Sequence, residues 1–103
     1  MIFRTNKITN YTKIDNKYLE NKNISLKAKG LLTLMLSLPD SWKFNINGLC
    51  LLCKESKDAV NNAIKELKEN HYVEIAKTYD DNGRFIYEYY IYENPDGIKI
   101  DSD

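Results

Sequence analysis

The chain has 103 residues, of which 43% are hydrophobic and 29% are charged, and its formal net charge at pH 7 is zero. This length supports one domain with a single hydrophobic core. No apolar run approaches the roughly 20 residues that a membrane-spanning helix needs. The N-terminal residues MIFRTNKITN contain no signal-peptide hydrophobic region, so we expect a cytoplasmic location.

The charges are distributed unevenly along the chain. Residues 1–58 contain ten Lys or Arg and five Asp or Glu, whereas residues 59–103 contain five and ten. A net charge of zero argues against strong nonspecific binding to nucleic acid. The basic excess predicts that any anionic partner would contact the first part of the chain, although chance clustering explains the asymmetry equally well.

Residues 1–24 alternate weakly between polar and apolar positions and are interpreted as an N-terminal arm. We expect a short strand at residues 11–14 and a single helical turn at residues 15–20. Four apolar side chains would allow the arm to pack on the rest of the domain: Ile8, Ile14, Tyr18 and Leu19.

The next segment predicts a helix that Ser25 caps and Pro39 stops. Its core stripe consists of Ala28, Leu31, Leu32, Met35 and Leu38. Leu34 and Leu36 widen that stripe, so the last two turns are apolar around most of their circumference. Such a helix must be covered on more than one side, by the N-terminal arm, by a later β-hairpin or by a second copy of the chain.

A minimal strand at residues 42–44, pairing with a later hairpin, is expected before a second short helix. Asn45 or Asn47 caps this helix, which ends near Cys53. Its inward residues are predicted to be Leu49, Leu52 and Cys53. Leu51 points outward and is a candidate for contact with a partner.

The sequence contains no recognisable catalytic or metal-binding pattern. Cys50 and Cys53 are the only cysteines and His71 is the only histidine, whereas a structural zinc site needs four ligands. Small buried thiols are therefore favoured over redox chemistry. The glycines are dispersed and form no phosphate-binding loop. We expect neither an enzyme nor a cofactor.

The segment from residue 56 to residue 70 predicts the central amphipathic helix, with Ser56 as its N-cap. Its apolar stripe consists of Val60, Ala63, Ile64 and Leu67. The opposite face carries Asp58, Asn61, Asn62, Lys65 and Glu69. A connector of two or three residues at Lys54 and Glu55 precedes it, which is typical of a DNA-binding helix-turn-helix.

After His71 the hydrophobic period changes from 3.6 to 2. This predicts strands at residues 72–79 and 84–92, joined by a turn at residues 81–83 that contains the hairpin signal Asn-Gly. The tyrosines of this hairpin, the wing, are expected mainly to serve cross-strand packing. The predicted fold is α+β, a winged helix-turn-helix with a three-helix core, a C-terminal β-hairpin wing and an extra N-terminal strand or turn. It occupies residues 25–93, and residues 94–103 form a tail or the start of a linker.

Three segments together resemble a known family. They are NISLKAKGLLTLMLSLPDSW, NINGLCLLCKESKDAVNNAIKELKENHYV and DDNGRFIYEYYIYE. They are similar, over residues 11–93, to the N-terminal winged-helix domain of phage replisome organisers and DnaD-like replication initiation proteins. The resemblance implies a cytoplasmic DNA-binding module that positions replication proteins, a C-terminal domain after it, and self-association. The chain departs from the family at Leu51, because the outward positions of this helix are typically polar in the family. The chain is expected to be a single-domain relative or a fragment of a longer protein.

The predicted contacts with double-stranded DNA lie mainly at the start of the central helix. They are Lys54, Ser56, Lys57, Asp58, Asn61, Asn62, Lys65 and Arg84. Asn61 and Asn62 carry amides that pair with adenine in the major groove. The lysines would neutralise phosphates, and Arg84 would reach a neighbouring minor groove. The alternative is that both asparagines simply form a solvated face.

A rival interpretation is a protein-interaction or oligomerisation module that does not bind DNA. The zero net charge and the apolar first helix favour it. The candidate residues for self-association into a homo-dimer or larger oligomer are Tyr11, Ile14, Leu34 and Leu51. A transcriptional regulator is a further alternative within the DNA-binding class.

Overall fold

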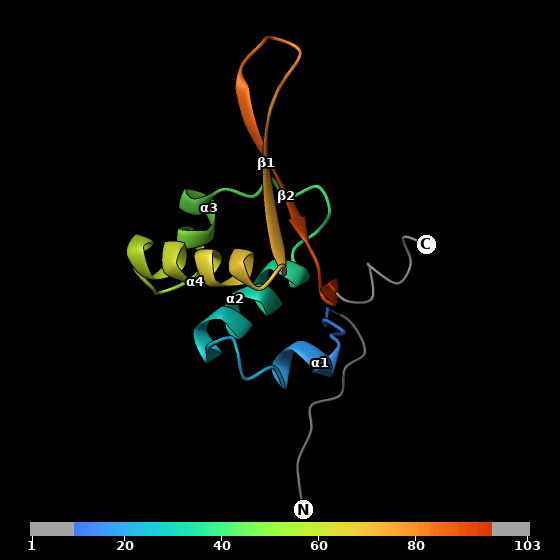
Figure 1. Cartoon of the computed structure of the whole chain (residues 1–103). Coiled ribbons are helices and arrows are strands. Elements are labelled where there is room, and N and C mark those ends of the chain that lie inside the picture. The colour runs from blue at the N-terminus through green and yellow to red at the C-terminus, as the bar shows by residue number, and fades with distance from the viewer. Residues whose placement is uncertain (1–9, 96–103) are drawn as a thin grey trace, which may run out of the picture.

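The structure is a computed structural model that describes residues 10–95. The elements are α1 (Asn16–Leu19), α2 (Leu26–Ser37), α3 (Ile46–Leu51), α4 (Lys57–Glu69), β1 (Val73–Tyr79) and β2 (Phe85–Ile91). Four helices and one antiparallel hairpin in this part of the chain make a small α+β domain (Figure 1). The order of the elements is compatible with a winged helix.

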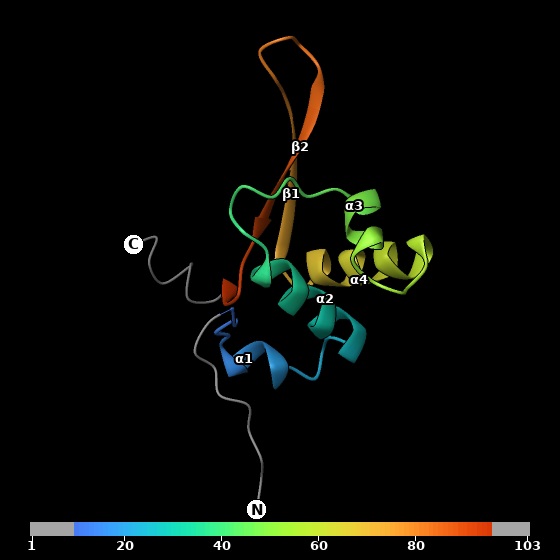
Figure 2. The same ribbon diagram turned by 180° about the vertical axis from the view of Figure 1, so that it is seen from behind.

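The helices form the body of the molecule and the hairpin projects away from it (Figures 1 and 2). Helix α4 lies across α2, and α3 packs on α4 on the side toward which the hairpin rises. The core consists of Tyr18, Ile24, Ala28, Leu31, Leu32, Met35, Leu49, Val60, Ala63, Ile64, Leu67, Tyr72 and Val73. It therefore ends at the base of the hairpin, and most of the distal half of the hairpin is exposed.

Helix α2 begins and ends where local chemistry predicts. The Ser25 hydroxyl accepts a hydrogen bond of 3.1 Å from the Ala28 amide, and Pro39 follows the C-cap residue Leu38. The first four residues of the predicted stripe are buried, and Leu38 is half-buried. Leu34 and Leu36 also pack against the core, which agrees with the expectation that this helix is covered on more than one side.

Helix α3 confirms one of the two predicted caps and corrects one core residue. The Asn45 side chain accepts a 2.7 Å hydrogen bond from the Gly48 amide, so Asn45 is the N-cap. Leu49 is buried, but Leu52, predicted to face inward, is 44% exposed. The helix has only six residues and packs on α4 chiefly through Leu49, so Leu52 falls at the edge of the core.

Helix α4 matches its prediction at both ends and on its buried face. Ser56 accepts from the Ala59 amide at 3.2 Å, and all four stripe residues are buried. At the C-terminus His71 adopts a positive φ of 68°. The His71 amide donates to the Lys68 carbonyl and the Tyr72 amide to the Leu67 carbonyl, the two bonds of a Schellman motif.

The hairpin has the predicted strands to within one residue at each end. Its register pairs Val73 with Ile91 at the base and Tyr79 with Phe85 at the tip. In the turn, the Asp80 carboxylate accepts from the Asn82 and Arg84 amides at 2.9 Å, and Gly83 has a φ of 77°. Glycine fits this turn because it adopts positive φ without steric cost.

Two predicted strands are wrong: within residues 10–95, only β1 and β2 form a sheet. Residues 42–44 contact the hairpin through side chains rather than backbone hydrogen bonds. The Phe44 ring stacks on Tyr89 with centroids 5.7 Å apart, and Trp42 packs edge-on against Phe44 at 4.9 Å. Residues 11–14 are likewise irregular, and Ile14 packs on the core instead of pairing.

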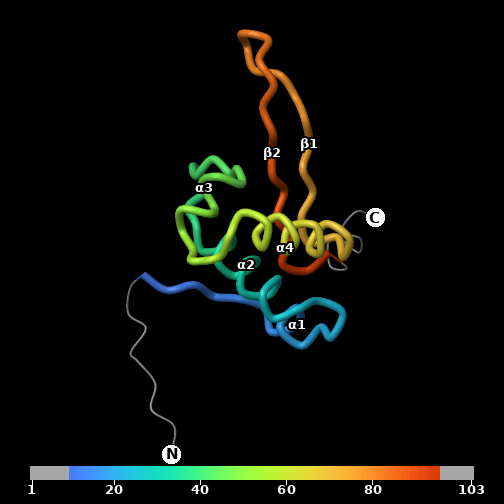
Figure 3. Tube along the Cα trace, turned by 90° about the vertical axis from the view of Figure 1, so that its left-hand side faces the viewer, coloured from blue at the N-terminus to red at the C-terminus, as the bar shows by residue number. Residues whose placement is uncertain are grey.

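The part of the predicted N-terminal arm that the structure describes belongs to the domain. The expected turn is α1, which lies at the end of the body away from the hairpin (Figure 3). Tyr18 within α1 is completely buried. The Tyr18 and Thr33 hydroxyls are hydrogen-bonded at 2.7 Å, and Asn21 donates to the Tyr72 hydroxyl at 2.9 Å. Burial raises the pKa of Tyr18. Residues 1–9 and 96–103, and with them most of the predicted tail, lie outside the described residues.

Candidate nucleic-acid interface

Helix α4 has two opposite faces of different character. One is the buried stripe, and the other is an exposed polar stripe made of Asp58, Asn61, Asn62 and Lys65. The polar residues recur at the same i, i+3, i+4, i+7 spacing as the buried ones, half a turn away. Within residues 10–95 the Asn61, Asn62 and Lys65 side chains form no hydrogen bond or ion pair. Their donors and acceptors are therefore available to a partner.

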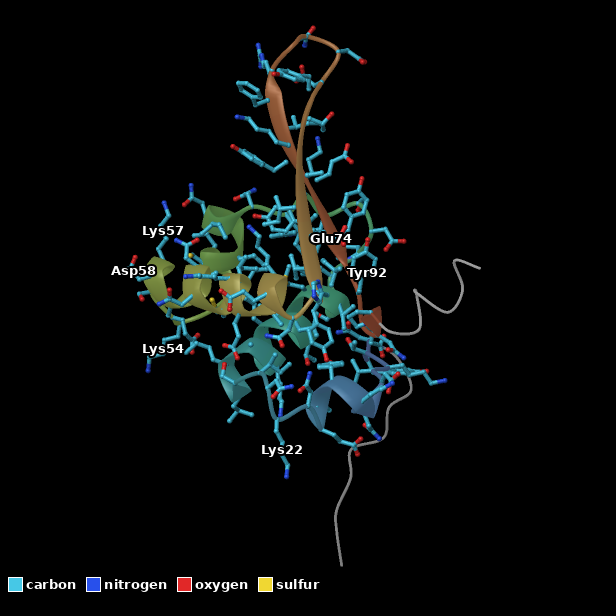
Figure 4. The ribbon with its side chains drawn as sticks, viewed as in Figure 1. Lys22, Lys54, Lys57, Asp58, Glu74 and Tyr92 are labelled. Carbon is cyan, nitrogen blue, oxygen red and sulfur yellow. The ribbon has the colours of Figure 1, made fainter. Side chains whose placement is uncertain are left out.

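The remaining predicted residues of this region gather at the N-terminal end of α4. Figure 4 places Lys54, Lys57 and Asp58 together at the end of the helix that is remote from the hairpin base. All three are exposed, as is Ser56. The free amides and the macrodipole of a helix N-terminus favour an anion at this end. Asp58 opposes a phosphate there, whereas the two lysines attract one.

Arg84 lies apart from this group, at the end of the hairpin. The hairpin has seven residue pairs, from Val73 and Ile91 at its base to Tyr79 and Phe85 near its tip, and Arg84 lies one position beyond the last pair. At about 3.4 Å per residue, the hairpin holds Arg84 about 24 Å from its base. The structure therefore does not join Arg84 to the α4 residues in one pocket. Only an extended partner could contact both.

The hairpin carries exposed aromatic residues, among them Tyr87, for which the sequence favours cross-strand packing. Tyr79, Phe85 and Tyr87 are between 56% and 62% exposed, whereas Tyr89, the next residue on the same face, is half-buried against the body. Lys77 lies beside them, although it was not predicted as a site residue. The alternation of Phe85, Tyr87 and Tyr89 along one strand was the available signal, because alternate residues share a face.

Two hydroxyls on the hairpin have raised pKa values, for different reasons. Burial against the body raises the pKa of Tyr89, with the neighbouring Tyr87 adding to the effect. On the opposite face, Tyr90 donates a 2.8 Å hydrogen bond to Glu88, and this bond raises the pKa of Tyr90 because it favours the protonated phenol. Both phenols remain neutral, so neither repels an anionic partner.

The predicted self-association residues do not form one surface. Leu51 is 88% exposed on α3, and Tyr11 is exposed at the start of the described chain. Ile14 and Leu34 are half-buried against the core. Leu34 also lines an apolar groove of about 470 Å³ between α2 and the first half of α4, beside the 85% exposed Leu26.

The described residues provide no cluster of His, Cys, Asp or Glu suited to a metal ion. Cys50 and Cys53 are free and half-buried, and the Cys53 thiol donates to the Leu49 carbonyl at 3.3 Å. None of the helices in residues 10–95 has the length and hydrophobicity that crossing a bilayer requires.

No family model, curated protein or solved structure matches this chain.

Proposed function

We propose that this chain is a winged-helix module that binds double-stranded DNA through the first half of α4, in a protein of the phage replisome organiser or DnaD-like replication initiation type. The observation that carries the proposal is the exposed polar stripe of α4, which has no partner within the domain. The helix follows α3 after three residues between the two caps, and the hairpin follows it directly. This is the order of elements in a winged helix-turn-helix.

In this proposal α4 enters the major groove with its N-terminal half. The Asn61 and Asn62 amides have the donor and acceptor pair that recognises adenine N6 and N7. Lys57 and Lys65 flank them and would contact phosphates, which position the helix without reading sequence. Arg84 at the tip of the wing would contact the same duplex beyond the groove that α4 occupies.

The second half of α4 supports the fold instead. Glu66 is half-buried and accepts hydrogen bonds from Ser25 at the start of α2. Glu69 is exposed on the polar stripe and would repel phosphate. The proposed contact therefore ends near Lys65.

Binding of labelled mixed-sequence duplexes, followed by fluorescence anisotropy, tests the proposal. Binding should weaken steeply between about 50 and 200 mM salt, because neutralising several phosphates releases condensed counterions. Absence of salt-sensitive binding at micromolar protein would exclude the DNA-binding role. Preference for a duplex from a replication origin over a promoter duplex of equal length would support replication rather than transcription.

A protein-interaction module is the second candidate, and the 85–88% exposure of Leu26 and Leu51 favours it. Leu26 lines the apolar groove between α2 and α4, and contiguous exposed apolar surface of this kind marks interaction sites. Sedimentation velocity over a range of protein concentrations tests this candidate. A monomer at every concentration that also fails to bind replication proteins would argue against it.

A further inference from the structure

One face of the distal hairpin consists of three aromatic rings and one cation. The register places Lys77 opposite Tyr87 and Tyr79 opposite Phe85, and alternate residues of a strand share a face. We call these four residues the aromatic face. The next pair toward the body on the same face is Ile75 and Tyr89, so the aromatic face continues the surface that meets the core.

The rings on this face are arranged for contact on their π surfaces. Tyr79 and Phe85 have centroids 4.8 Å apart at an interplanar angle of 37°. The Lys77 ammonium lies 3.8 Å from the centroid of the Phe85 ring. Because the three rings are more than half exposed, a flat apolar group of a partner has access to them.

The acidic side chains of the strands lie on the other face. Glu74, Ala76 and Thr78 occupy the alternate positions of β1, opposite Tyr90, Glu88 and Ile86 of β2. Lys77 is therefore the only charged residue among the four of the aromatic face. At the tip, the carboxylate of Asp80 already accepts two backbone hydrogen bonds. An anionic ligand that approaches the aromatic face therefore meets the Lys77 ammonium first.

The strand that carries Phe85 and Tyr87 is anchored to the body at Tyr89. Phe44 stacks on Tyr89 at an interplanar angle of 27°, and Trp42 packs edge-on against Phe44. Phe44, in the segment that leads into α3, therefore packs the base of the hairpin against the body, and Trp42 supports Phe44. A platform fixed in this way loses little conformational freedom when a ligand stacks on it.

We propose that the aromatic face binds unpaired bases of single-stranded DNA. Every base has a π face, and aromatic rings interleaved with cations bind single strands by stacking. The choice of DNA as the nucleic acid rests on the proposed function of α4, whereas the stacking site itself rests on the hairpin. A module with both sites binds best where a duplex adjoins a single strand.

The test compares three labelled probes by fluorescence anisotropy: a duplex, the same duplex with an unpaired 3′ or 5′ thymidine tail, and a thymidine homopolymer. The variants are Tyr87→Leu and Phe85→Leu on the aromatic face. Tyr90→Leu is the matched control, because it removes a similarly exposed tyrosine from the opposite face. Circular dichroism and thermal unfolding check that each variant remains folded.

The wild type should bind the tailed duplex about tenfold more tightly than the plain duplex, and Tyr87→Leu should lose that gain while Tyr90→Leu retains it. Equal affinity for the tailed and plain duplexes would overturn the proposal, as would equal losses in the two tyrosine variants. Binding of the homopolymer without binding of the duplex would support the stacking site on the hairpin and would exclude duplex binding by α4. Sedimentation without DNA gives a further outcome. If the sedimentation coefficient of the wild type increases with protein concentration and Tyr87→Leu abolishes this increase, the aromatic face serves self-association and the proposal is overturned.

Discussion

Glu66 of α4 caps the first turn of α2 through Ser25. Its carboxylate accepts one hydrogen bond from the Ser25 amide and another, at 2.8 Å, from the Ser25 hydroxyl. In a capping box the third residue of the same helix supplies this carboxylate. Here that residue is Ala28, so the acid comes from another helix. The contact joins the second half of α4 to α2 and leaves the first half of α4 exposed to a partner.

Replacing Glu66 should destabilise the fold. We expect Glu66→Ala to lower the free energy of unfolding by about 1–2 kcal/mol, because two polar groups of Ser25 lose their partner. Urea unfolding followed by circular dichroism measures the change. Glu69→Ala is the control, since Glu69 is exposed on the same helix, and it should change stability by less than about 0.5 kcal/mol. Equal effects of the two substitutions would contradict this role of Glu66.

The lysines of α4 should contribute affinity that depends on salt. We expect the double variant Lys57→Ala, Lys65→Ala to bind duplex DNA more weakly and to reduce the slope of log affinity against log salt by about 2. The matched control is Lys17→Ala with Lys22→Ala, which removes the same charge from the arm. Figure 4 shows Lys22 at the far end of the body from the hairpin. An equal loss in both double variants would indicate attraction by net charge alone.

The asparagines of α4 should contribute sequence preference rather than overall affinity. We expect Asn61→Ala or Asn62→Ala to reduce discrimination at one A·T position by about 1–3 kcal/mol, because a bidentate contact to adenine is lost. Selection of bound sequences from a randomised duplex pool, with wild type and variants in parallel, measures this change. Unchanged preference at every position would assign both residues to a solvated face.

The C-terminus of α4 contains a position that favours glycine. His71 holds a φ of 68°, a conformation in which the Cβ of an L-residue is crowded. We expect His71→Gly to raise the free energy of unfolding by up to about 1 kcal/mol, because relief of strain outweighs the added flexibility of the unfolded chain. Thermal and urea unfolding check this. A loss of stability would indicate that the exposed imidazole contributes a contact to the fold.

Alkaline pH should unfold the protein partly through Tyr18. Its folded-state pKa is raised by burial above the unfolded value of about 10. The stabilisation is therefore complete below pH 10 and is lost as the pH rises beyond it, because the phenolate would be desolvated. We expect Tyr18→Phe to show a smaller loss of stability between about pH 9 and 11. Parallel slopes for the two proteins would mean that folding leaves the pKa of Tyr18 unchanged.

The local patterns of this sequence determined most of the secondary structure. Ser25, Asn45 and Ser56 have side chains that satisfy free amides at helix starts, so the caps follow from residue type alone. The Asn-Gly turn and the alternation beyond His71 likewise specify the hairpin, because turn geometry and strand period are local properties. The apolar stripe of α4 specified its buried face for the same reason.

Only the tertiary structure decided which segments meet. Residues 42–44 have the composition of a strand, yet they contact the hairpin through the ring of Phe44, on which Trp42 packs, and the predicted backbone pairing does not form. Glu66 reaches Ser25 across 41 positions of sequence, and Arg84 is held far from α4. The exposure of the aromatic rings depends on where the buried core ends, which is at Val73. No periodicity in the sequence indicates the end of the core. Contacts between distant segments are set by how all the elements pack together, and a local pattern carries no information about them.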